Sequence, residues 1–205
     1  MAELAHVEVR SRSELRAWLA EHHEQRESVW LVTYKKATPD WYVSYDAIVE
    51  ELICYGWIDS RVGKVDELRS KLMISPRRPG SGWSRVNKVR VAYLESAGRL
   101  AEPGRAMIEQ ARADGSWTAL DEIEELVVPD ELAAAFAIHP SAEAYWRAFP
   151  RSVKRGHLEL LLGAKSAETR ARRIADIVRY AEADCRFGFP GEREKLEARR
   201  QDGGA

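Results

Sequence analysis

Three stretches near the start of the chain have the pattern of β-strands. Residues 29–35 are rich in β-branched and aromatic side chains, and residues 68–75 alternate between apolar and polar positions. Residues 58–64 have strand character as well, and the short connection through Asp66 and Glu67 indicates an antiparallel hairpin. We therefore expect residues 29–35, 58–64 and 68–75 to form one antiparallel sheet.

The other apolar positions follow the period of a helix. Ser11 has a glutamate three residues later, as in a capping box, and Ser44 is suited to cap a second helix that ends near Gly56. After the Pro- and Gly-rich loop at residues 76–82 the apolar period changes from two to 3.6, and Ser84 is placed to cap the next helix. The sequence predicts an α+β fold, in which a small antiparallel sheet with flanking helices is followed by a helical lobe.

These patterns divide the chain into three parts. We expect an α+β part over residues 1–100 and a helical part over residues 101–185. Residues 186–205 contain a charged run and several glycines, and we expect them to form a flexible tail.

The composition is that of an ordinary soluble protein. The 205 residues are 45% hydrophobic and 32% charged, and the formal net charge is −1. No apolar run approaches the length that a membrane-spanning helix needs, and residues 1–10 lack the apolar core of a secretory signal. Cys54 and Cys185 match no metal or redox spacing, so a disulfide framework is excluded. We expect a cytoplasmic protein without membrane insertion.

Although the net charge is close to zero, basic and acidic residues are concentrated in different segments of the chain. Residues 69–94 carry seven Lys and Arg residues and no acid, residues 113–146 carry eight acids and no base, and residues 147–173 are basic again. Either the acidic and basic helices face each other, or one basic stretch forms an anion-binding surface. A sequence pI near 6.5 argues against a dedicated nucleic-acid domain, so nucleic-acid binding is expected to be weak at most.

The loop at residues 76–82 and the helix start after it combine groups that suit an anion. Glycines allow close approach of backbone N–H groups, arginines offer fork-shaped donors, and a helix N-terminus favours negative charge. A tryptophan adds a flat face for a base or a sugar. The candidate ligand-binding residues of this segment are Arg77, Arg78, Ser81, Trp83, Ser84, Asn87 and Lys88.

Trp57, Asp59 and Arg61 alternate on the strand predicted upstream of this loop. Alternation places their side chains on one face, where they would form one wall of a pocket. A structural interpretation remains open beside this one. In it, Ser84 and Asn87 only cap a helix, the tryptophans belong to the core and Asp59 only neutralises Arg77 or Arg78.

Residues for a classical catalytic site are poorly represented. The five histidines show no metal-ligand spacing, so neither a metal nor a cofactor is expected. Asp59 is the only carboxylate beside the basic loop, and it is the candidate general base if the chain is an enzyme. A second basic cluster, at residues 165–173, is expected to form ion pairs with the acidic 113–146 segment.

Two stretches resemble a known family. The first contains CYGWIDS and SPRRPGSGWSRVNK, between residues 54 and 88, and the second contains VPDELAAAF and GAKSAETRARRIADIV, between residues 128 and 181. Together they are similar to the bacterial YdeI/OmpD-associated family, also called bacteriocin-protection proteins, whose front part is grouped with the YjbR/CyaY-like superfamily. The resemblance implies a small sheet with flanking helices and a role in protection against bacteriocins. It implies no reaction and no catalytic residues.

The leading functional hypothesis is a cytoplasmic protein of bacteriocin protection or stress response that binds a small ligand bearing phosphate or carboxylate. One alternative is an enzyme acting on a small anionic metabolite, with Asp59 as its base. A second is weak nucleic-acid binding, and a third is an interaction scaffold with a protein partner and no small ligand.

Overall fold

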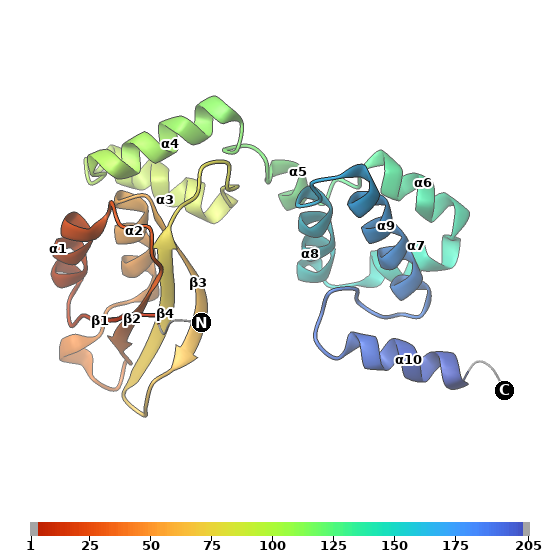
Figure 1. Ribbon diagram of the computed structural model, residues 1–205, viewed down its shortest axis with the longest axis horizontal. Coiled ribbons are helices and arrows are strands. Elements are labelled where there is room, and N and C mark those ends of the chain that lie inside the picture. The colour runs from red at the N-terminus through yellow and green to blue at the C-terminus, as the bar shows by residue number, and fades with distance from the viewer. Residues whose placement is uncertain (1–3, 203–205) are drawn as a thin grey trace. The chain divides into compact units, whose positions relative to one another are not determined.

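A computed structural model describes residues 4–202 as two compact units that divide after Ala119. Figure 1 shows the sheet in the N-terminal unit, up to Ala119, and only helices in the C-terminal unit, from Leu120 onward. The predicted α+β class is confirmed, and no strand follows residue 100 within the described part of the chain.

The sheet of the N-terminal unit contains the three expected strands and one more. The order is β1-β2-β4-β3, with β1 at His6–Glu8, β2 at Val29–Tyr34, β3 at Trp57–Lys64 and β4 at Arg69–Pro76. The β3–β4 hairpin is antiparallel as predicted, and β2 pairs antiparallel with β4. Strand β1 was not predicted; it pairs parallel with β2, so the sheet as a whole is mixed. Three residues are too short a run to show a period in the sequence.

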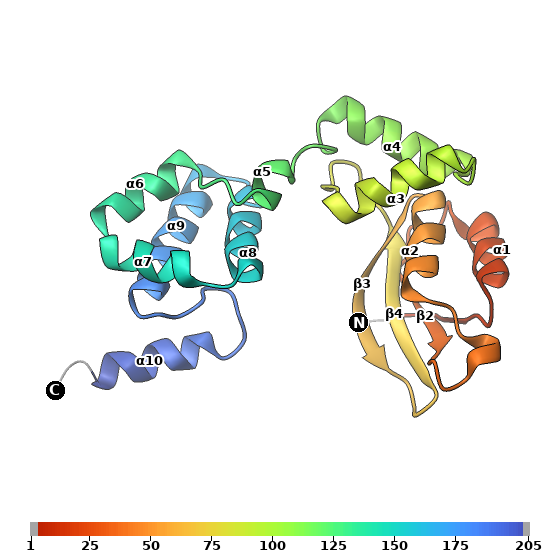
Figure 2. The same cartoon turned by 180° about the vertical axis from the view of Figure 1, so that it is seen from behind.

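The helices of this unit are α1 (Arg12–His22), the 3-10 turn η1 (Pro39–Trp41), α2 (Tyr45–Cys54), α3 (Arg85–Ser96) and α4 (Glu102–Asp114). Helices α1 and α2 cover one face of the sheet, and α3 and α4 pack against α2. Figure 2 shows α1 and α2 together on one side of the strands. Leu15 and Leu19 of α1 pack with Leu52 of α2 against Leu31 and Ile74 of the sheet, and this is the principal core of the unit. Burial of such side chains contributes about 1.5–3 kcal/mol each.

The predicted helix caps are confirmed. The side-chain oxygens of Ser11, Ser44 and Ser84 accept backbone N–H groups in the first turns of α1, α2 and α3. Each cap stabilises its helix start by about 1 kcal/mol.

Helix α4 lies against the C-terminal end of α2 because Gly104 permits a very close approach. A Cβ at Gly104 would lie 2.3 Å from the carbonyl oxygen of Cys54. The same oxygen accepts the N–H of Ala101 at 3.2 Å. Helix α4 therefore belongs with the sheet, and the structural boundary at Ala119 lies beyond the predicted one at residue 100.

The C-terminal unit consists of helices around an aromatic core. They are α5 (Asp121–Glu124), α6 (Asp130–Ile138), α7 (Pro140–Ala148), α8 (Arg151–Leu162), α9 (Ala167–Glu182) and α10 (Glu192–Asp202). Phe136 and Trp146 have ring centroids 5.4 Å apart and pack with Leu158 and Ile177. None of the helices between residues 4 and 202 is long and apolar enough to cross a bilayer.

Helix α10 lies within the segment for which a flexible tail is predicted. Its Leu196 is buried against Tyr180 and Cys185. The flexibility of residues 186–205 stays a prediction, and its last part, residues 203–205, lies outside the described residues.

Candidate functional site

The loop after β4 is anchored by Arg77. Its backbone N–H donates to the carbonyl of Gly56 at 2.8 Å, which holds the start of the loop against the end of α2. Its side chain is 3% exposed, and the guanidinium carbon lies 3.8 Å from the ring centroid of Trp83. Nη1 donates to the carbonyl of Gly82 at 3.2 Å. Arg77 and Trp83 thus bind the two ends of the loop to each other.

The guanidinium of Arg77 is not in contact with a carboxylate in the described part of the chain. No carboxylate among residues 4–202 forms an ion pair with it, and its buried Nε has no hydrogen-bond partner. Burial lowers the pKa of Arg77 to about 10, while the charge of Asp59 acts in the opposite direction. The guanidinium therefore stays positive at neutral pH, with its charge only partly compensated by Trp83 and Gly82.

The tip of the loop is closed by its own hydrogen bonds. Ser81 donates to the carbonyl of Arg78 from both its hydroxyl, at 2.6 Å, and its backbone N–H, at 3.1 Å. Gly80 has a φ of +76°, a conformation that glycine adopts without strain. The space beneath the loop is too small to admit even a water molecule, so it is no ligand cavity. A ligand would therefore contact the outer surface of the loop, where Arg78 is exposed.

The start of α3 continues the site. Ser84 Oγ accepts the N–H of Asn87 at 3.4 Å, and Asn87 Oδ1 accepts from Arg90 at 3.1 Å. The amine of Lys88 lies 5.6 Å from the ring centroid of Trp117. Ser84 and Asn87 thus have the structural roles of the alternative interpretation, and the positive end of the α3 dipole lies beside the loop.

Trp57, Asp59 and Arg61 do not form one wall. Trp57 is buried in the core, with its ring edge-on to Trp18 at 5.5 Å, and Asp59 accepts the hydroxyl of Tyr45 at 2.8 Å. A bulge between Asp59 and Val62 shifts the register of β3. An inserted residue reverses the alternation, so Arg61 lies on the opposite face, with Nη2 3.4 Å from the sulfur of Met73.

The Tyr45 hydroxyl that donates to Asp59 is a weaker acid than an ordinary tyrosine. Burial, together with the hydrogen bond to Asp59, raises the pKa of Tyr45 to about 12. The pair is therefore a neutral phenol donating to a carboxylate across α2 and β3. Among the sequence-predicted residues, the structure brings together Arg77, Arg78, Ser81 and Trp83, with Ser84, Asn87 and Lys88 on the helix that follows.

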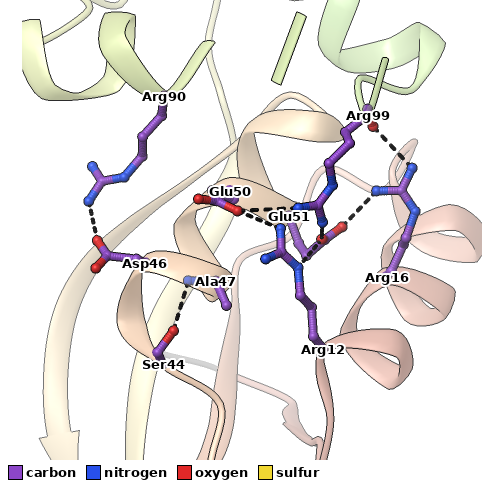
Figure 3. A network of polar contacts seen from close by, with 9 residues as sticks. All are labelled: Arg12, Arg16, Ser44, Asp46, Ala47, Glu50, Glu51, Arg90 and Arg99. Atoms are coloured by element: carbon purple, nitrogen blue, oxygen red, sulfur yellow. Dashed lines mark hydrogen bonds and ion pairs between the residues drawn. The ribbon is translucent and has the colours of Figure 1, made fainter. Parts of the chain in front are cut away.

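The analysis of the sequence missed an ion-pair network centred on Glu51, shown in Figure 3. Glu51 is fully buried, and its oxygens accept from Arg12 at 2.6 Å, from Arg99 at 2.7 Å and from Arg16 at 2.8 Å. Glu50 adds contacts to Arg12 at 2.6 Å and to Arg99 at 3.5 Å. The network joins α1, α2 and the connection between α3 and α4. One signal was available, because Glu51 lies three residues after the inward-facing Ile48.

The charged groups of this network bond mainly to one another. Both oxygens of Glu51 are occupied, and Arg16 also donates to the carbonyl of Arg99 at 3.1 Å. We assign it a structural role. Among the described residues no group of three His, Cys, Asp or Glu side chains is placed to hold a metal ion.

Comparison with known families separates the chain in the same way as the fold. Residues 125–184 match the family described as bacteriocin-protection, YdeI or OmpD-associated. We refer to this matched segment as the OmdA domain. Residues 7–107 match a domain of unknown function, DUF8412. Neither the curated proteins nor the solved structures gave a match to this chain.

The OmdA domain contains the second of the two stretches on which the resemblance rests, so that part of the resemblance is confirmed. The first stretch lies in the DUF8412 match, and the YjbR/CyaY-like relationship of the front part stays a prediction.

Within the OmdA domain the acidic and basic segments do contact each other. Arg170 of α9 pairs with Glu131 of α6 at 3.3 Å and donates to the carbonyl of Leu161 at 3.1 Å. Arg170 lies in the basic cluster and Glu131 in the acidic segment, as predicted. This contact ties α9 to α6 and α8.

His157 of α8 is a core residue of the OmdA domain. Its Nδ1 accepts the indole N–H of Trp146 at 3.0 Å, and its Nε2 lies 3.0 Å from the carbonyl of Phe187. These partners require the neutral tautomer with hydrogen on Nε2. Burial lowers the pKa of His157 to about 4, so it is uncharged at neutral pH.

Proposed function

We propose that the N-terminal unit binds a phosphate- or carboxylate-bearing ligand on the outer surface of the 76–88 loop, and that the chain acts in the protection of bacteria against bacteriocins. The observation that carries the ligand proposal is the environment of Arg77. A buried guanidinium without a paired carboxylate places positive charge at the base of the loop, and the adjacent Arg78 offers a second, exposed guanidinium. The carboxylate of Asp114 lies beneath the loop, where it accepts the N–H of Gly80, so it offsets part of this charge on the inner side.

The two arginines have different roles in this proposal. Arg77 positions the loop, because its own contacts are to Trp83 and to the Gly82 carbonyl. Arg78 contacts the ligand with its fork of donors. Ser81 and Lys88 lie on the loop and on the first turns of α3, where they extend the anion-binding surface.

The role in bacteriocin protection rests on the OmdA domain, whose family description names that activity. We also propose a cytoplasmic location and a part in stress response. The location has support from Cys54 and Cys185, which are buried free thiols, as is usual in a reducing compartment. For the sheet unit we keep the YjbR/CyaY-like assignment, supported by the sequence resemblance.

The alternative of an enzyme with Asp59 as general base has less support. Asp59 is engaged by the Tyr45 hydroxyl, and the bulge moves Arg61 to the other face of the sheet. A general base needs a free lone pair directed at its substrate together with groups that stabilise the developing charge.

A protection assay tests the proposal in cells. Bacteria sensitive to a bacteriocin would express the wild type, Arg78→Ala or the control Arg105→Ala, an exposed arginine of α4 outside the loop. We expect survival with the wild type and the control, and reduced survival with Arg78→Ala at equal protein levels. Survival no better than that of cells with an empty vector would contradict the protective role. Full protection by Arg78→Ala would contradict the role of the loop.

A further inference from the structure

The sheet face opposite α1 and α2 carries a second set of candidate binding groups. Directly paired residues share a face, and Leu31 and Leu72 face the helices. Their neighbours along the strands therefore point the other way. Register places His6, Trp30 and Met73 in one row across β1, β2 and β4, and Glu8, Val32, Lys71 and Gly63 in the next row.

This face is hollowed beside the second row. The hollow has a volume of about 500 Å³, within the range of small-molecule sites. Its lining consists of His6, Glu8, Val32, Lys64, Val65, Arg69 and Lys71. All four strands and the β3–β4 turn therefore contribute to the lining, which combines basic side chains and one carboxylate with two valines.

Most charges at the hollow are already paired. Arg69 contacts Glu8 at 2.6 Å and Asp66 at 2.7 Å, and Lys64 pairs with Glu67. Lys71 differs, because no carboxylate in the described residues forms an ion pair with it. Its amine lies 3.4 Å from His6 Nε2 and 4.5 Å from the ring centroid of Trp30.

Gly63 positions the Lys71 side chain. A Cβ at Gly63 would lie 3.2 Å from Lys71 Cγ and 3.3 Å from Cε, so the lysine stem runs closely across the neighbouring strand. A side chain at position 63 would push this stem aside. Because Gly63 has no Cβ, the Lys71 side chain can lie across β3 and hold its ammonium at the hollow.

We propose that this hollow binds the phosphate group of a small phosphorylated metabolite, with Lys71 and His6 contacting the phosphate and Val32 and Val65 contacting the uncharged part. An unpaired ammonium beside an imidazole offers several donors to one tetrahedral anion. The carboxylates of Glu8, which lines the hollow, and of Glu67, which pairs with Lys64, repel an extended polyanion and favour a small ligand over a nucleic acid. The site is separate from the 76–88 loop and does not rest on the function proposed for it.

An NMR titration of the full chain with ribose 5-phosphate tests this inference. We expect shifts of the Trp30 indole N–H and of the His6 imidazole C–H signals, and no such shifts with ribose alone. Lys71→Met should weaken binding about tenfold or more, because a charged hydrogen bond is lost. Gly63→Val should have a similar effect by displacing Lys71. Arg78→Ala is the matched control and should leave this binding unchanged.

Several results would overturn the inference. One is saturation of the shifts at the same concentration in Lys71→Met as in the wild type. Another is an effect confined to the Trp83 indole and removed by Arg78→Ala, which would support the loop site instead. Binding of a single-stranded oligonucleotide without binding of ribose 5-phosphate would also overturn it. His6→Ala provides a second test should Lys71→Met fail to fold, since His6 is exposed and lies at the start of the edge strand β1.

Discussion

The guanidinium of Arg77 and the indole of Trp83 lie 3.8 Å apart, and both side chains are almost completely buried. The contact joins the first residue after β4 to the residue before the α3 cap. The contact therefore fixes the conformation of the loop, although its prolines and glycines alone would suggest a flexible segment. A ligand at Arg78 would thus meet a preorganised surface, which lowers the entropic cost of binding.

Arg77 and Arg78 are adjacent, but we predict that only the substitution of Arg77 reduces stability. Arg77→Ala should reduce the free energy of unfolding by about 1–3 kcal/mol, because it leaves a cavity over Trp83 and an unpaired Gly82 carbonyl. Arg78→Ala should leave that free energy nearly unchanged, since the side chain is exposed. Urea unfolding followed by tryptophan fluorescence measures both. Equal destabilisation by the two variants would show that the loop is not anchored as described.

Glu51 is predicted to be the most sensitive charged residue of the N-terminal unit. Glu51→Gln should cost about 3–5 kcal/mol, because three arginines lose the buried carboxylate between them. Glu102→Gln is the matched control, as its contact to Arg105 is a long one at 3.7 Å on an exposed surface. Denaturant titration of both variants is the measurement. A Glu51→Gln protein as stable as the control would contradict the structural role of the network.

The OmdA domain is predicted to lose stability between pH 6.5 and pH 4. The pKa of His157 is lowered to about 4 in the folded state, so the unfolded chain binds a proton more readily in this interval. The stability is fully present above pH 6.5 and falls by up to about 3 kcal/mol towards pH 4.

Thermal unfolding at a series of pH values measures this dependence. His157→Gln keeps a donor and an acceptor but does not titrate, so it should show a shallower slope. The control His139→Gln replaces a half-exposed histidine of the same domain, which contacts Glu182 at 2.7 Å, and should leave the contribution of His157 in place. A slope that His157→Gln does not change would contradict the assignment.

Duplex DNA is predicted to bind weakly, without sequence preference, and only at low salt. Several cations of the basic stretches are engaged, for example Arg69 with Glu8 and Asp66, and Arg90 with Asp46 at 2.5 Å. Few counterions would then be released from the DNA, and the remaining attraction would be screened. Fluorescence anisotropy at low and at physiological salt tests this. Tight binding that persists at physiological salt would favour nucleic acid as the ligand.

Much of the fold was accessible from the sequence because its signals are local. The β3–β4 hairpin, the serine caps and the helical C-terminal part each follow from short patterns of apolar and polar residues. Strand β1 was missed because its three residues are held by parallel pairing to β2, a contact between distant segments.

The candidate site was harder to predict from the sequence, because it also depends on contacts between residues that are not neighbours in the chain. The bulge after Asp59 reverses the side-chain alternation of β3, and no residue in that stretch marks it in the sequence. The burial of Arg77 depends on Trp83 folding back over it, while charge alone suggested an exposed side chain. The helical spacing of Glu51 from Ile48 indicated that Glu51 faces inward, but its partners Arg12 and Arg99 lie far away in the sequence and could not be identified from it.

Calorimetric titration tests the proposed ligand site of the 76–88 loop most directly. The ligands would be inorganic phosphate, pyrophosphate, citrate and ATP, added to the Lys71→Met protein so that the sheet hollow does not contribute. We predict that at least one of them binds, and that a further Arg78→Ala change weakens this binding by about one to two decades, or about 1.5–3 kcal/mol, with the melting temperature unchanged. Binding that Arg78→Ala leaves intact, or no binding by any of the four anions, would contradict the account.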